Sequence, residues 1–161
     1  MRVRSSPNLS AFSSPAKECP SATQDTDPAD RRADRLLAYL GLLDDAAPLF
    51  GSSTSVPRAG VLLALPALLQ SGVFECAQKI YGSIGPAFYG LRTSLLTLLL
   101  MALWRIKRPE ELKEHSPADL GRVLGLDRAP EVKTLRRKLA RLAAHGRAAE
   151  LGRALAQRRV A

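Results

Sequence analysis

The chain has few of the β-branched residues from which strands are usually built. Its 161 residues include only 7 valines and 3 isoleucines, against 28 leucines and 24 alanines. Leucine and alanine favour helix, whereas valine and isoleucine favour strand. The sequence therefore predicts an all-α protein and argues against folds that need a central sheet.

Cysteines and long apolar runs are also scarce. The two cysteines, Cys19 and Cys76, can build neither a disulfide framework nor a structural zinc site, which is typical of a reducing cytosol. No apolar segment of a secretory signal follows the N-terminus. The strongest apolar run, 93–104, has 12 residues, whereas a bilayer span needs about 20. We therefore expect this run to form a buried core helix.

Positive charge is present in excess, and it is concentrated in the last third of the chain. The formal net charge is +9. Residues 1–104 hold 9 basic and 8 acidic side chains, a net of +1, whereas residues 105–161 hold 15 and 7, a net of +8. A basic region of this kind indicates a polyanionic partner, either nucleic acid or an anionic membrane surface. A basic helical surface without a partner is the simpler alternative.

Amino-acid composition and the positions of prolines and glycines divide the chain into three regions. Residues 1–27 are rich in serine and proline and predict a disordered tail. Residues 28–104 form a leucine- and alanine-rich helical core region, and residues 105–161 form a basic, helix-turn-helix-like region. Periodicity, prolines and glycines predict helices over 28–44, 58–70, 73–81, 93–104, 116–124, 127–145 and 147–159, with a single helical turn from 108. The expected architecture is a bundle of short helices around the leucine-rich central one.

Two of these helices carry a specific expectation about their orientation. In the first, one apolar stripe should face the core, backed by charged residues; the stripe is Leu36, Leu37, Leu40 and Leu43, and the backing residues are Arg31, Arg32, Asp34 and Arg35. The helix over 58–70 is apolar nearly all round, so we expect it to be mostly buried, and to be kinked or broken at Pro66.

The segment 116–142 carries the main functional signal. It reads as a short helix, a glycine-containing turn and a second helix, the arrangement of a helix-turn-helix whose second helix can lie in the DNA major groove. Helical spacing puts Val132, Leu135, Leu139 and Leu142 on one face of that second helix. On the opposite face it puts the basic residues Lys133, Arg137 and Arg141 with Thr134, and on the flanks Arg136 and Lys138. We predict that these six residues contact DNA.

Two other classes of function remain open for the same residues. The apolar face over 132–142 follows heptad spacing until Gly146 interrupts it, so it could instead pair with a partner helix in an interaction or dimerisation protein. The apolar segments 58–70 and 93–104 could form a hairpin in a membrane. Neither half reaches spanning length, so the membrane is the least favoured partner.

Enzyme chemistry finds little support in the sequence. His115 and His145 have no cysteine or second histidine at metal-ligand spacing, so each is expected at a cap or on the surface. Asp44 and Asp45 are neighbours on a helix end and do not converge as a general acid and base would. The stretch 82–86 lacks the Lys-Ser/Thr of a phosphate-binding loop and predicts a turn.

Five blocks of the sequence resemble a known family. They are LGLLDDAAPLF (40–50), VPRAGVLLALPALL (56–69), GPAFYGL (85–91), MALWRIKRPEEL (101–112) and SPADLGRVLGLDRAPEVKTLRRKL (116–139). Together they resemble the N-terminal region of bacterial transposases that carry a DDE-type catalytic domain. The similarity covers about residues 30–160, and its most specific part is RIKRPEEL followed by LGLDRAPEVKTLR.

The resemblance implies a helical DNA-binding region followed by a ribonuclease-H-like domain whose acids hold two divalent metals for strand cleavage and transfer. The acids after residue 104 all fall on predicted helices or turns: Glu110, Glu111, Glu114, Asp119, Asp127, Glu131 and Glu150. The chain ends about where that domain should begin. We therefore expect an N-terminal fragment that is not an enzyme alone and has no cofactor, the metal being implied only for the missing domain.

These observations predict the DNA-binding portion of a transposase, acting in DNA transposition and recombination. The expected partners are duplex DNA, at transposon ends or nonspecifically, and a second copy of the chain or a full-length transposase. No small-molecule substrate is expected. Localisation should be cytoplasmic and nucleoid-associated.

Overall fold

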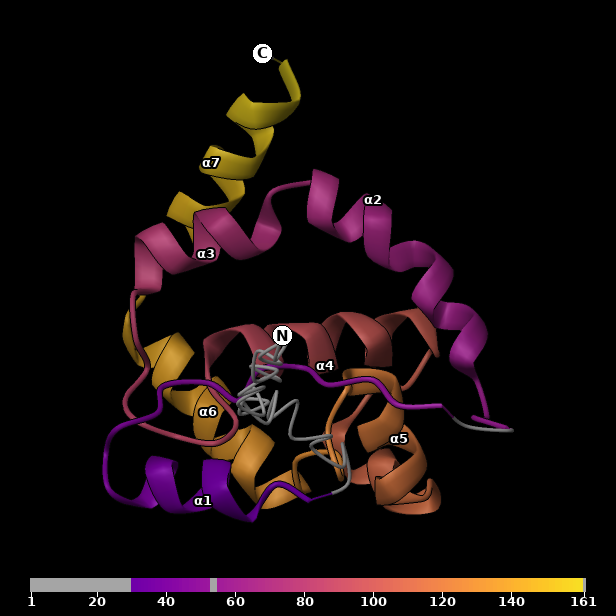
Figure 1. The fold of residues 1–161 in the computed structure, drawn as a ribbon. Coiled ribbons are helices and arrows are strands. Elements are labelled where there is room, and N and C mark those ends of the chain that lie inside the picture. The colour runs from indigo at the N-terminus through magenta and orange to yellow at the C-terminus, as the bar shows by residue number, and fades with distance from the viewer. Residues whose placement is uncertain (1–29, 53–54, 161) are drawn as a thin grey trace, which may run out of the picture.

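All of the regular secondary structure in the described residues is helical. The computed structural model describes residues 30–52 and 55–160, so the predicted Ser/Pro-rich tail over 1–27 lies outside the described residues. Within these ranges the chain forms helices and no strand (Figure 1), which confirms the all-α prediction. The elements are α1 (Arg32–Tyr39), η1 (Ala59–Ala64), α2 (Leu65–Gln70), α3 (Val73–Tyr81), α4 (Leu91–Leu103), η2 (Pro109–Glu114), α5 (Pro117–Leu124), α6 (Val132–Ala144) and α7 (Ala148–Val160), where η denotes a 3-10 helix.

Several element boundaries follow directly from local sequence signals. The predicted helix over 73–81 is α3 without change. The predicted break near Pro66 is confirmed, because η1 gives way to α2 at Leu65 and the proline occupies the first turn of α2, where its missing N–H removes no helix bond. At α5, the Ser116 side chain accepts the N–H of Asp119, and Gly125 ends the helix at φ +70°.

Helix α4 is the central helix of the fold, as predicted. Leu100 and Met101 lie in the main core, and the first half of the helix buries three hydroxyl residues. The Ser94 hydroxyl donates to the Gly90 carbonyl at 2.7 Å, and the Thr97 hydroxyl donates to the carbonyl of Thr93 at 2.7 Å. Because these hydroxyls are satisfied inside the helix, α4 can be buried on polar as well as apolar sides.

Asp45 caps the N-terminus of α4 from a distant part of the chain. Its carboxylate accepts the backbone N–H groups of Gly90 and Thr93, each at 3.0 Å, and the Thr93 hydroxyl at 2.5 Å. A side chain at Gly90 would not fit, since a Cβ there would lie 2.1 Å from the Asp44 carbonyl oxygen. Asp45 therefore serves as a helix cap, with a negative charge at the positive end of α4.

The main core joins the predicted core region to the basic region. Leu100 from α4 packs in one cluster with Leu112 of η2, Val123 of α5 and Leu135 of α6. The loop after α5 comes very close to that helix at Gly121, where a Cβ would lie 2.3 Å from the backbone of Arg128. A smaller cluster, built on Ala77, Ile84 and Leu91, connects α3 to the start of α4.

The orientation predicted for the first helix is wrong for most of its apolar stripe. Leu36 and Leu40 are each 58% exposed, and no residue of α1 is buried. Only Leu43, which follows the helix, packs against the main core as predicted. Part of the charged side packs inward instead: Arg31 is 2% exposed and donates to the carbonyls of Ala47, at 2.6 Å, and Gly125, at 3.3 Å. Those carbonyls are oriented to accept a guanidinium, so a polar contact fixes the helix where an apolar one was expected.

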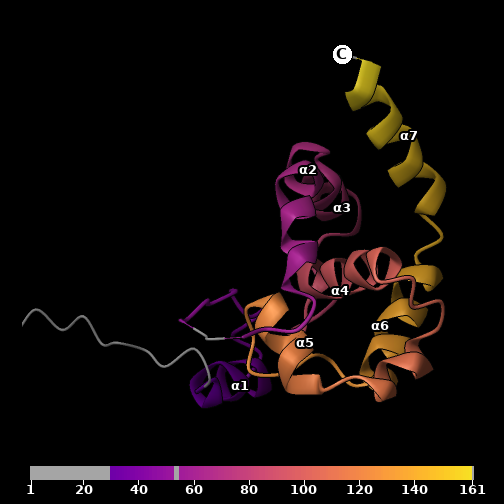
Figure 2. The same ribbon diagram turned by 90° about the vertical axis from the view of Figure 1, so that its right-hand side faces the viewer.

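The prediction that 58–70 is mostly buried is also wrong. No residue of η1 or α2 is buried, and Leu63 is 87% exposed. Val61 and Leu62 of η1 are half-buried and pack against the main core, whereas Figures 1 and 2 show α2 standing above α4. Among the described residues, no single helix is long and apolar enough to cross a membrane. One pair of consecutive helical segments, 59–70 and 73–81, reaches the required length and hydropathy when the two are combined, but the chain bends by 60° between them.

Helix α7 packs against α3 and projects past it, as both views show. Arg158 near its end forms an ion pair with Glu75 of α3 at 2.5 Å. At its start, Arg147 pairs with Glu150 at 2.7 Å and also donates to the Ile80 carbonyl. The contacts at both ends hold the last helix against α3 rather than against the main core.

Candidate nucleic-acid interface

Helix α6 has the amphipathic orientation predicted for it. Leu135 is fully buried, and Val132 and Leu139 pack on the same main core. Leu142 packs on the smaller cluster. Other parts of the same chain therefore cover the apolar face of α6. This face is not free to pair with a helix of another protein, as the alternative prediction of an interaction or dimerisation protein required.

The opposite face of α6 presents basic side chains to solvent. Lys133, Arg136, Arg137 and Arg141 are exposed and Thr134 is half-buried. Figure 2 shows α6 at one side of the molecule, with α1 on the other. The structure therefore brings five of the six predicted DNA-contacting residues to an accessible helix surface.

The exposed basic residues differ in how they are held. Within the described ranges, no ion pair engages Lys133 or Arg137. Arg136 forms an ion pair with Glu110 of η2. Arg141 donates from Nη1 to the Ile84 carbonyl at 3.1 Å, which positions its guanidinium beside the 83–85 turn. The positive charge of the surface is thus carried chiefly by Lys133, Arg137 and Arg141.

The assignment of Lys138 to this surface is wrong. Lys138 is only 3% exposed, and its Nζ has no hydrogen-bond partner among the described residues. At about 100° per residue, position 138 lies only about 40° from Leu142 on the helix circumference, so it borders the apolar face. Burial lowers the pKa of its ammonium, the charges of Arg141 and Arg137 lower it further, and Asp45 opposes them.

Replacing Lys138 by methionine is expected to stabilise the fold. A buried cation without a hydrogen-bond partner costs free energy, and methionine fills a similar volume without charge, so we expect about 1–2 kcal/mol of added stability. Because the folded-state pKa is lowered, the gain is largest at neutral pH, where the lysine is charged, and shrinks as pH approaches about 10.5. Urea unfolding of both proteins at several pH values measures it; a less stable methionine variant at pH 7 contradicts the burial argument.

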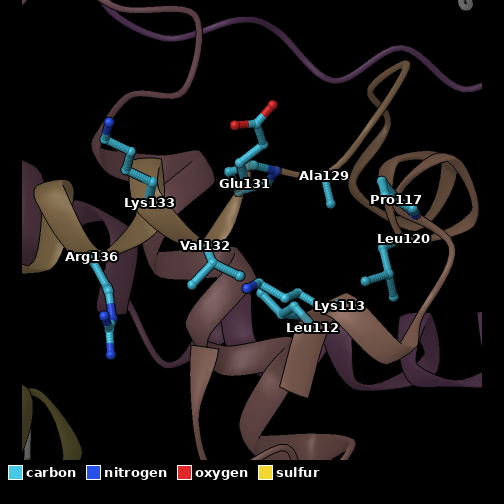
Figure 3. Close-up of a pocket in the computed structure, with 10 residues that line it drawn as sticks. Leu112, Lys113, Pro117, Leu120, Ala129, Glu131, Val132, Lys133 and Arg136 are labelled. Carbon is cyan, nitrogen blue, oxygen red and sulfur yellow. The ribbon is translucent and has the colours of Figure 1, made fainter. Parts of the chain in front are cut away.

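A groove of about 550 Å³ opens beside the start of α6 (Figure 3). Most of its wall is apolar, and its charged side chains are Lys113, Glu131, Lys133 and Arg136. Figure 3 shows the side chain of Lys113, from η2, directed toward Val132 in the first turn of α6. Lys113 was not among the residues predicted from the sequence, because that prediction considered the basic side chains of one helix only. The one signal available was that Lys113 lies within residues 105–161, which carry a net charge of +8.

A second, shallower depression lies at the other end of the basic face. It holds about 330 Å³ and is lined by Ser83, Ile84, Arg141, Ala144 and His145. His145 is exposed and meets the Tyr81 ring edge-on, with ring centroids 6.0 Å apart. The expected surface position of His145 is confirmed.

The arrangement of α5 and α6 leaves the helix-turn-helix assignment as a prediction. Residues 125–131 connect the two helices, and α6 packs chiefly on η2 rather than on α5. The N-terminus of α6 has no side-chain cap, and its first turn has no acidic residue. What the structure establishes is a helix anchored by its apolar face and basic on its outer face.

Comparison with known proteins identifies the family. Residues 28–160 match the family described as "Transposase protein". The chain belongs to this transposase family. Searches of curated proteins and of solved structures gave no match. The matched range of the transposase chain includes every helix from α1 to α7, so both the core and the basic face fall within it.

The acids of the transposase chain do not gather into a metal site in the part of it that the structure describes. No group of three or more His, Cys, Asp or Glu residues there could hold a metal ion. Several of the acids after residue 104 are engaged in ion pairs: Glu110 with Arg136, Asp119 with Arg122, Asp127 with Arg35 and Glu150 with Arg147. These residues therefore do not fit the two-metal centre that the resemblance implies for a catalytic domain.

Proposed function

We propose that this transposase-family chain binds duplex DNA during transposition, with the outer face of α6 against the duplex. The observation that carries the proposal is the exposed set Lys133, Arg137 and Arg141 on a helix whose other face is anchored in the core. A rigidly held helix presents its cations at fixed spacing. Guanidinium groups can then bind phosphates or the O6 and N7 edge of guanine.

The charge distribution supports DNA over a neutral or apolar partner. Residues 105–161 carry +8, and Lys133 and Arg137 are engaged by no carboxylate of the described residues. Phosphate contacts from such residues release counterions, and this release drives most of nonspecific DNA binding. The expected ligand is a duplex, at a transposon end or elsewhere.

We assign the recognition of DNA, rather than strand cleavage, to these residues. The sequence resembles bacterial DDE-type transposases, in which such a helical region is expected to precede the domain that cleaves. This resemblance supports the proposal that the region is not catalytic alone. The proposed location is with the nucleoid in the cytoplasm, where the DNA partner is.

A salt series with fluorescent duplex DNA tests the proposal. Anisotropy is recorded as the purified chain is added at several salt concentrations between about 50 and 200 mM. We expect the logarithm of the binding constant to fall linearly with the logarithm of salt, with a slope of about −3 if three phosphates are neutralised. Absence of binding at the lowest salt, or binding that salt leaves unchanged, contradicts the proposal.

A further inference from the structure

The loop between α4 and η2 presents three basic side chains that do not belong to the α6 surface. Arg105, Lys107 and Arg108 are all exposed. In the part of the chain that the structure describes, none of them forms an ion pair with a carboxylate. We call residues 105–108 the basic loop. Its three cations are free to meet a polyanion from solvent.

The backbone at Arg105 has a conformation that glycine usually supplies. Arg105 follows the C-cap of α4 and has φ +59°. Its N–H donates to the Ala102 carbonyl at 3.1 Å, and the N–H of Ile106 donates to the Met101 carbonyl at 2.9 Å. This pair of bonds is a Schellman motif, in which the left-handed residue is usually glycine because a side chain there crowds the backbone. The same pair of bonds ends α5, where the left-handed residue is Gly125.

The fold itself does not explain why an arginine occupies this position. Among the described residues with positive φ, all but Arg58 and Arg105 are glycines. A cation near the end of α4 is favoured by the helix dipole, but a basic residue in the last turn gives the same benefit without a left-handed backbone. Backbone strain that the fold does not require is typical of functional positions. A role of the Arg105 side chain outside the fold explains the strain.

The basic loop is held firmly beneath its exposed side chains. Ile106, between Arg105 and Lys107, is 7% exposed and belongs to the main core together with Leu135 of α6. The N–H of Lys107 donates to a carboxylate oxygen of Glu111 at 3.1 Å. A loop fixed in this way presents its cations at defined positions, as the phosphate contacts that position a protein on a duplex require.

The basic loop leads directly into the element that borders the proposed DNA surface. The next element, η2, packs against α6, and Glu110, two residues after Arg108, pairs with Arg136 on the flank of the outer face. The two nearest acids of η2 are therefore engaged, Glu110 by α6 and Glu111 by the loop backbone. A helix that lies in the major groove has a phosphate backbone on each side of it, so a basic loop on this flank is placed to meet one of them.

The ligand follows from what the basic loop and α6 share. Both present cations that no carboxylate of the described residues engages, and they belong to adjoining elements, so a polyanion bound to one lies close to the other. A DNA duplex carries one negative charge per about 1.7 Å of its axis, which is dense enough to meet both sets. We propose that Arg105, Lys107 and Arg108 bind DNA phosphates beside the groove that α6 occupies. This inference rests on the proposed function of α6, which supplies the ligand.

The salt dependence of duplex binding by the full chain tests the basic loop. Each neutralised phosphate contributes about 0.9 to the slope, so six contacts predict a slope of about −5 for the wild type, against about −3 for α6 alone. The variant Lys107→Gln/Arg108→Gln should reduce the magnitude of the slope by about 2 and weaken affinity at least about tenfold at about 100 mM salt. Both side chains are exposed, so circular dichroism should show unchanged helix content.

The variant Arg105→Gly separates a role in DNA binding from a role in the fold. It removes the left-handed strain together with the cation, so it should unfold at the same urea concentration as the wild type or at a higher one. Its slope should nevertheless be smaller in magnitude by about 1. A variant that unfolds at a lower urea concentration and keeps the wild-type slope overturns the proposal.

The variant Arg32→Gln is the matched control for loss of charge. The Arg32 side chain is 90% exposed and paired with Asp30, and it lies on α1, which Figure 2 shows on the opposite side of the molecule from α6. The substitution removes one positive charge, as Arg105→Gly does, but no phosphate contact. It should keep the wild-type slope, and a reduction equal to that of Arg105→Gly would assign both effects to net charge and overturn the proposal.

Comparison with Arg137→Ala distinguishes the basic loop from α6. If the loop variants keep the wild-type slope while Arg137→Ala reduces it, the basic loop does not contact DNA and the proposed function of α6 stands. If the loop variants reduce the slope and Arg137→Ala does not, DNA lies on the basic loop and the assignment of α6 fails. A wild type that binds no duplex at about 50 mM salt overturns both proposals.

Discussion

Replacing Arg137 and Arg141 together by alanine is expected to weaken duplex DNA binding about a hundredfold. A hydrogen bond to a charged group contributes about 1.5 kcal/mol or more, so each lost guanidinium should cost about tenfold in affinity. Both residues are exposed on the outer face of α6. Anisotropy with a fluorescent duplex at fixed salt measures the change.

The control for this variant comes from the same helix. Lys138→Met removes one positive charge from a buried position, so we expect DNA affinity within about twofold of wild type. The helix content of the double arginine variant should equal that of the wild type, because exposed residues contribute little to stability. If the double arginine variant binds DNA as tightly as the wild type, the outer face of α6 is not the DNA-binding surface.

Leu135→Ala is expected to have the largest effect on stability. Leu135 is fully buried and packs in the cluster that joins α4, α5 and α6. Truncation of a buried leucine removes its transfer free energy and leaves a cavity, so the free energy of unfolding should fall by about 2–5 kcal/mol. Urea unfolding followed by circular dichroism measures the loss.

An exposed leucine provides the comparison for this substitution. Leu63→Ala makes the same chemical change at a position that is 87% exposed, and its effect should stay within about 0.5 kcal/mol. If Leu135→Ala unfolds at the same urea concentration as Leu63→Ala, then α6 is not anchored in the core. The proposed DNA surface would then lack its rigid support.

Local signals in the sequence predicted the elements that depend on local chemistry. The N-cap at Ser116, the glycine stop at Gly125 and the break near Pro66 each depend on backbone groups within a few residues. The burial of α4 was also predictable, because 93–104 has no charged side chain and must be covered on most sides. In these cases one segment contains all of the information.

Contacts between distant segments were not predictable from periodicity. The apolar stripe of α1 was expected to face inward, but carbonyl oxygens of Ala47 and Gly125 bind the guanidinium of Arg31 instead. The sequence of α1 alone does not show that these two carbonyl oxygens lie opposite its charged side. The same holds for Asp45, whose role as a cap depends on α4 starting beside it.

The candidate site was predicted in outline and corrected in detail. Helical spacing identified the outer face of α6, since Lys133, Arg137 and Arg141 lie far from its leucine side on the circumference. It could not place Lys138, because a residue at the border is buried or exposed according to what packs beside it. Lys113 was missed because it reaches the start of α6 from a different element.

The salt dependence of DNA binding by single-charge variants of α6 tests the central claim most directly. Wild type, Arg137→Ala and Lys138→Met are compared in one salt series against the same duplex. If the outer face of α6 contacts phosphates, the slope for Arg137→Ala should be smaller than that of the wild type by about 1, and the slope for Lys138→Met should be unchanged. Equal slopes for wild type and Arg137→Ala would contradict the account.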